Sequence, residues 1–125
     1  GNAENQAELA HLRRGLVERT GQDDESFLSD YIGLFLEDAE ARLGHMSRSF
    51  ASGESEALSR DGHALKGACL ELGASRMVRF CDDLSAAAKN DNREEMEVVL
   101  GQLERELDRL RPVYQSVQVS SMSPS

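Results

Sequence analysis

The chain has 125 residues, of which 39% are apolar, 30% charged and 5% aromatic. This length suits one domain, and the aliphatic, charge-rich composition is typical of a helical bundle rather than a β-sandwich or barrel. The net charge of −9 disfavours binding to nucleic acid or to an anionic membrane, because the field of the protein repels phosphates. This charge favours a protein partner instead. The sequence has neither a run of about 18 apolar residues nor a basic-then-apolar leader, so we expect a cytoplasmic protein.

Apolar residues recur at steps of three and four along five stretches, which predicts five helices. The expected ranges are 4–19, 23–50, 54–72, 75–89 and 91–110. Gly73 is placed to end the third helix in a left-handed conformation, and Ser75 to cap the fourth. Asp91 and Glu94 have the spacing of a capping box at the start of the fifth.

The last helix contains a proline near its expected end. Proline removes a backbone donor and crowds the preceding turn. The last helix is therefore expected either to end near Leu110 or to bend at Pro112 and continue through Val117. Its charged residues are expected to form a solvated face; they are Glu104, Arg105, Glu106, Asp108 and Arg109.

Short loops between long amphipathic helices favour antiparallel neighbours. The predicted fold is therefore all-α, an antiparallel up-and-down four-helix bundle of residues 23–117 with the short first helix across one end. Residues 1–3 are interpreted as disordered or as a remnant of expression, and 4–117 as the helical domain. The Ser-rich residues 118–125 are expected to be a disordered tail. A monomer is expected, because one core uses all the apolar stripes.

Neither the cysteines nor the acidic and histidine residues indicate a metal site. Cys69 and Cys81 both lie on apolar stripes and are interpreted as small core residues. Glu8 and His11 form a single Glu-x-x-His, whereas carboxylate-bridged di-iron bundles use two copies with facing glutamates. We therefore expect no metal and no cofactor bound by the chain itself.

One histidine lies on the outer face of the third helix. If Leu65 marks the centre of the buried stripe, His63 lies about 160° round the helix, with Gly67 beside it and Lys66 on its flank. Gly67 costs about 1 kcal/mol of helix stability relative to alanine, which suggests that something bulky approaches His63. An exposed histidine alone is most often an ordinary surface residue.

The residues around this histidine carry a more specific pattern. The string His63-Ala-Leu-Lys66-Gly67 is followed by Leu72-Gly73-Ala74 and then by Cys81 and Leu84. This pattern resembles the signature of histidine-containing phosphotransfer (HPt) domains, which reads approximately His-x-Leu-Lys-Gly, Leu-Gly-Ala and Cys-x-x-Leu. The helical layout extends the resemblance to residues 20–117.

The resemblance implies a phosphorelay carrier. His63 would accept a phosphoryl group from a receiver-domain aspartate and pass it to another, with Mg²⁺ held by the receiver. Lys66 would stabilise the phosphoryl group, and Gly67 would leave room for the partner. The implied partners are response-regulator receiver domains and a hybrid sensor kinase, and the residues expected to bind them are Phe27, Tyr31, Leu34, Arg60, Leu70, Ser85 and Lys89.

The chain has no Gly-rich phosphate loop, so it is not expected to bind ATP or to act as an enzyme. Three alternatives to the carrier stay open. A non-enzymatic adaptor with the same fold is the first alternative, and a kinase-substrate module of a chemotaxis-type kinase is the second. A bundle enzyme with a metal centre is the third.

Overall fold

The computed structural model describes residues 2–122, and the side chains of residues 3–116. These residues form five α-helices and no strand, which confirms the all-α prediction. The helices are α1 (Asn2–Thr20), α2 (Glu25–Ala51), α3 (Ser55–Leu72), α4 (Ser75–Lys89) and α5 (Arg93–Met122). None of the helices in this part of the chain is long and apolar enough to cross a membrane.

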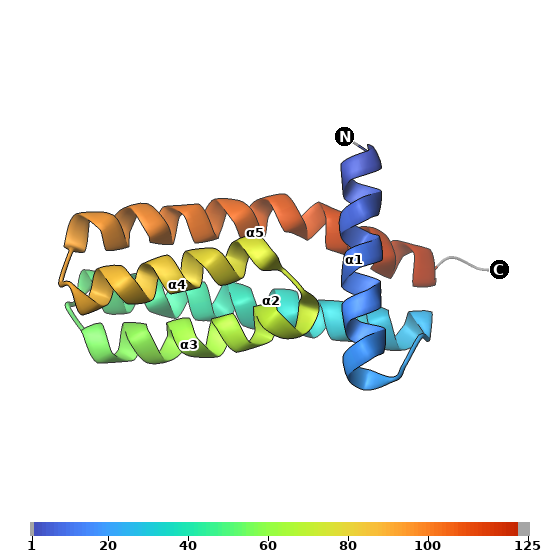
Figure 1. Ribbon diagram of the computed structural model, residues 1–125, viewed down its shortest axis with the longest axis horizontal. Helices are drawn as coiled ribbons and strands as arrows, with labels where there is room; N and C mark the ends of the chain where they lie inside the picture. Colours follow the sequence, from blue (N-terminus) through green and yellow to red (C-terminus); the bar gives the residue numbers. More distant parts are fainter. Residues whose placement is uncertain (1, 123–125) are drawn as a thin grey trace.

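Helices α2 to α5 lie along the long axis of the molecule, and α1 crosses them at one end (Figure 1). Helix α3 packs against α2 and α4, and α5 packs against the same two helices from the other side. Helix α1 contacts α3 and α5. One core runs through all five helices and includes Leu16, Ile32, Leu65, Met77 and Leu103, none of which exposes any of its surface.

The turn between α3 and α4 agrees with the glycine expected there. Gly73 has φ of 74°, and the backbone N–H of Ala74 donates to the carbonyl of Cys69 at 2.9 Å. This left-handed turn closes α3 and brings α4 back alongside it. A side chain at Gly73 would be strained by this φ angle, and its Cβ would meet the ring of His11 at 3.0 Å.

Two predicted helix caps are wrong. Ala74, not Ser75, occupies the N-cap position of α4, and Ser75 is its first helical residue. The N–H of Glu95 bonds to the side chain of Asn92 at 3.2 Å, so Asn92 caps α5. Asp91 is not available for that role because it takes φ of 54° within the preceding turn.

The predicted solvated face of α5 is wrong at Glu106, which is only 6% exposed. Arg109 donates to Glu106 at 2.6 Å and also to Glu8 of α1 at 2.7 Å. Helix α1 crosses α5 here, and Glu106 lines a hollow with residues of α1 and of the start of α4, where Arg76 lies 3.9 Å away. The paired arginine makes burial of the Glu106 carboxylate tolerable.

Helical backbone covers residues 2–3 and 118–122, for which disorder was expected, whereas residues 1 and 123–125 lie outside the described part. The alternative interpretation of residues 1–3 as a remnant of expression stays a prediction. Helix α5 continues past Pro112, and the stretch from Val113 to Met122 holds no further proline or glycine to end it. Each residue added to an existing helix contributes one more backbone hydrogen bond.

The two cysteine thiols are expected to be unreactive in the folded protein. Cys69 and Cys81 are free and buried, and burial raises the pKa of both thiols, that of Cys81 to about 12. Because the thiolate is the reactive form, a disulfide reagent at pH 8 should label neither residue until the chain is unfolded with guanidinium. An Asn90→Cys variant provides an exposed thiol as a control. Stoichiometric labelling of the native wild type would contradict the burial.

Candidate functional site

His63 lies in the middle of α3 and points to solvent. The buried side of the helix is formed by Leu58, Gly62, Leu65, Cys69 and Leu72. His63 is exposed, and within the described part of the chain no side chain hydrogen-bonds or pairs with its ring. A neutral imidazole in this state keeps one ring nitrogen with a free lone pair, which makes it a potential nucleophile.

A small hollow between α3 and α4 lies beside His63. Its polar lining comes from Ser59, His63 and Lys66 of α3 and from Asp82 and Ser85 of α4. Apolar side chains line the rest of the hollow; they belong to Leu58, Cys81, Leu84 and Ala88. Gly62 lets the two helices approach closely here, since a Cβ at that position would already contact Leu84 at 3.8 Å.

Lys66 is paired within the hollow. Its Nζ lies 2.6 Å from Oδ1 of Asp82, and the two side chains are 34% and 56% exposed. Asp82 was not predicted from the sequence, and it lies one helical turn before the predicted Ser85 on α4. The antiparallel course of α3 and α4 brings Asp82 to the level of Lys66.

Gly67 leaves open space beside the histidine. A Cβ built at this position would meet no atom within 4 Å, apart from the helix's own neighbouring backbone. No close packing within the described residues therefore requires glycine here. This observation agrees with the interpretation that Gly67 keeps the surface free for a bulky partner.

The predicted docking residues divide into exposed and packed groups. Leu34 and Leu70 are exposed large apolar residues, with 67% and 48% of their surface accessible, and Arg60 and Lys89 are also exposed. Ser85 is half-buried in the hollow, whereas Lys89 is not among the residues that line it.

The two aromatic residues of the predicted docking set lie against the protein core. Phe27 and Tyr31 are half-buried, and their ring centroids lie 6.0 Å apart. The Tyr31 hydroxyl donates to Glu71 of α3, and burial together with this bond raises its pKa to about 12. Of the three predicted docking residues on α2, only Leu34 is exposed, whereas Phe27 and Tyr31 are half-buried.

The other two histidines have different surroundings. His45 of α2 contacts Asp61 of α3 through Nδ1, and Arg42 pairs with the same carboxylate at 3.2 Å. These contacts tie α2 to the flank of α3 that faces α2, away from the outward face that carries His63. His11 lies in α1 against Gly73.

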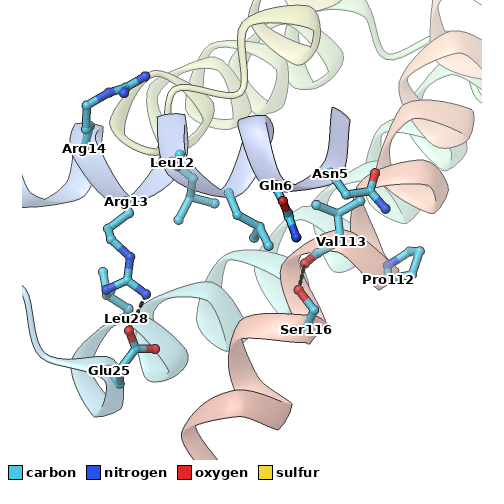
Figure 2. A pocket seen from close by; sticks show the side chains of 12 residues that line it. Asn5, Gln6, Leu12, Arg13, Arg14, Glu25, Leu28, Pro112, Val113 and Ser116 are labelled. Atoms are coloured by element: carbon cyan, nitrogen blue, oxygen red, sulfur yellow. Dashed lines mark hydrogen bonds and ion pairs between the residues drawn. The ribbon is translucent and has the colours of Figure 1, made fainter. Parts of the chain in front are cut away.

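A larger open hollow lies where α1 crosses the start of α2 and the end of α5 (Figure 2). Arg13 points across it toward Glu25, with which it forms an ion pair, and it also pairs with Asp23 at 3.2 Å. None of the residues predicted from the sequence to bind phosphate or a partner lines this hollow. Among the described residues, no group of three or more histidine, cysteine or acidic side chains is arranged to hold a metal ion.

The segment that carries this surface matches a known domain family. The family model described as the Hpt domain matches residues 30–112, which is well over half of the chain. The chain belongs to the HPt domain family. The match runs from α2 into α5 and includes His63, Lys66, Gly67 and both sides of the hollow, so it confirms the resemblance read from the sequence.

Membership of this family gives the general function of the protein. HPt domains take part in phosphotransfer in two-component signalling, where they are phosphoryl carriers that interact with receiver domains and kinases. Neither the comparison with curated proteins nor the comparison with solved structures found a significant match.

Proposed function

We propose that this HPt domain accepts a phosphoryl group from a receiver-domain aspartate on His63 and passes it to an aspartate of another receiver. The observation that carries the proposal is that an exposed, unpaired histidine shares one small hollow with a lysine, inside the segment that matches the family. The open surface at Gly67 supports access by a folded partner.

The chemistry needs little from the chain beyond this nucleophile. The free lone pair of the imidazole attacks the phosphorus of the aspartyl phosphate, a P–N bond forms, and the P–O bond breaks as the aspartate carboxylate leaves. The ring proton on the other nitrogen is released to water when the phosphorylated ring returns to its neutral form. Return transfer reverses these bonds on a second aspartate, with Mg²⁺ supplied by the receiver, since phosphoryl transfer depends chiefly on positioning and charge stabilisation.

The proposal extends to the assembly. We propose an antiparallel up-and-down four-helix bundle formed by α2 to α5, with α1 laid across one end, acting as a cytoplasmic monomer that binds no ATP. Exposed Leu34, Leu70 and Arg60 would contact receiver domains, including that of a hybrid sensor kinase. Phe27 and Tyr31 would support this surface from beneath through their packing.

The test is transfer from a phosphorylated receiver. The purified chain is mixed with a receiver domain carrying labelled phosphate on its aspartate, in the presence of Mg²⁺. An acid-labile, base-stable label on the chain supports the proposal, because these stabilities distinguish phosphohistidine from phosphoserine. Binding to several receivers without any label would favour the adaptor instead. Labelling by a chemotaxis-type kinase with ATP but by no receiver would favour the kinase-substrate module.

Lys66→Gln is expected to shift the transfer equilibrium away from phosphohistidine by about fivefold. Lys66 and His63 line the same hollow. The attraction between opposite charges about 4 Å apart in water corresponds to roughly fivefold. The measurement is the ratio of labelled chain to labelled receiver at equilibrium. This equilibrium ratio depends only on the free energies of the phosphorylated and unphosphorylated forms of the two free proteins. Contacts made only while the two proteins are docked therefore do not change it.

Lys89→Gln is the matched control, since it removes the same charge from an exposed residue that does not line the hollow. It should leave the ratio within about twofold of the wild type, as expected for an exposed charge screened by salt. An equal effect of the two substitutions would contradict a specific role for Lys66.

A further inference from the structure

The ion pair between Lys66 and Asp82 places a negative charge at the hollow that His63 also lines. Asp82 projects from α4 between the buried residues Cys81 and Leu84, so packing against the core fixes the part of the helix that carries it. Its carboxylate reaches across to Lys66 of α3, and both residues line the same hollow as His63. The sequence pattern of the family does not include this aspartate.

A phosphoryl group on His63 would change the electrostatics of this hollow. It brings a charge of about −1.5 to −2 and three strong acceptor oxygens. Lys66 is the cation that lines the hollow, and its ammonium already contacts a carboxylate. The phosphoryl oxygens must therefore compete with Asp82 for Lys66, and the carboxylate repels them directly.

The neighbouring charges differ from Asp82 in position. Asp83 is also exposed on α4 but does not line the hollow, and the same holds for Arg79 and Lys89. Among the described residues, Asp82 is therefore the carboxylate that lines the hollow together with His63. Because Lys66 and Asp82 are both partly exposed, their pair is weak enough to break when a partner or a phosphoryl group arrives.

We propose that Asp82 is a positioning residue that sets how readily the phosphoryl group leaves His63. Before transfer, its carboxylate holds the flexible Lys66 side chain beside the histidine. After transfer, it competes with the phosphoryl group for Lys66 and raises the free energy of the phosphohistidine, which favours onward transfer to an aspartate. This inference rests on the proposed function of His63 as a carrier.

The experiment compares Asp82→Asn, Asp82→Glu and Asp83→Asn with the wild type in the equilibrium with a phosphorylated receiver and Mg²⁺. Asp82→Asn should shift the equilibrium toward phosphohistidine by about three- to tenfold, since removing one unit charge at about 4 Å in water corresponds to roughly fivefold. Asp83→Asn removes the same charge one residue away and should shift it by less than about twofold. Asp82→Glu restores the charge and should return the ratio toward that of the wild type.

A second route to the phosphorylated chain distinguishes failure of the role of Asp82 from failure of the carrier function of His63. Phosphoramidate transfers its phosphoryl group to histidine without a receiver: a P–N bond to the imidazole forms, the original P–N bond breaks, and ammonia leaves. If the wild type is labelled but Asp82→Asn behaves like Asp83→Asn, the role of Asp82 is overturned while the carrier function stands. A shift of Asp82→Asn away from phosphohistidine also overturns it. If neither route labels the wild type, the carrier function itself fails.

Discussion

The His63→Gln variant is expected to lose phosphoryl acceptance by about a thousandfold or more, because it removes the nucleophile that forms the P–N bond. Removing a nucleophile from an enzyme active site has comparable or larger effects. Glutamine is a good helix former, and His63 is exposed without a side-chain partner in the described part of the chain. The free energy of unfolding should therefore change by no more than about 0.5 kcal/mol. The measurements are label transfer from a phosphorylated receiver and thermal unfolding by circular dichroism.

The chain offers two matched controls for this variant, because it has three histidines. His11→Gln and His45→Gln should keep full labelling, since His11 lies against Gly73 and His45 is paired with Asp61 on the flank of α3. If His45→Gln lost the label while His63→Gln kept it, the phosphoryl group would lie on α2, which would contradict the assignment to His63 of α3.

Substitution of Gly67 is expected to separate stability from function. Gly67→Ala should raise the free energy of unfolding by about 1 kcal/mol, because alanine is the better helix former and its Cβ would meet open space. Gly67→Trp should keep the fold but lower the rate of transfer from a receiver by about a hundredfold. A side chain of this size one turn from His63 obstructs the close approach that in-line transfer requires, and small misplacements in such sites cost about that factor.

Val98→Trp is the control for added bulk. Val98 is 51% exposed on α5, which packs against α2 and α4 rather than against the helix that carries His63. The Val98→Trp variant should therefore accept the phosphoryl group from a receiver at the wild-type rate. Labelling of Gly67→Trp by phosphoramidate should also be nearly normal, because a small donor does not need the cleared surface. A Gly67→Trp variant that accepts phosphate from the receiver as fast as the wild type would contradict the role of Gly67 in access.

The course of the helices and the exposure of His63 could be predicted from local sequence alone. The spacing of Leu58, Leu65, Cys69 and Leu72 places His63 on the outer face of α3, and the structure exposes it there. Gly73 ends this helix with the left-handed conformation expected of it. These features depend on helical periodicity and on the conformational freedom of glycine, which act within a few residues of the chain.

The remaining features depend on how helices meet, which periodicity does not reveal. Burial of Glu106 follows from the crossing of α1 over α5, and the pairing of Lys66 with Asp82 follows from the register between α3 and α4. Phe27 and Tyr31 lie off the central stripe of α2, and sequence alone left both packing and docking open for them. The structure packs them against the core.

Mapping the phosphoryl group to a residue tests the central claim most directly. The chain is phosphorylated by a receiver, digested at alkaline pH where phosphohistidine is stable, and analysed by tandem mass spectrometry. Our account predicts one phosphorylated site, at His63, in a peptide that is unmodified when Mg²⁺ is omitted from the transfer reaction. A phosphoryl group on His11, on His45 or on a side chain other than histidine would contradict it.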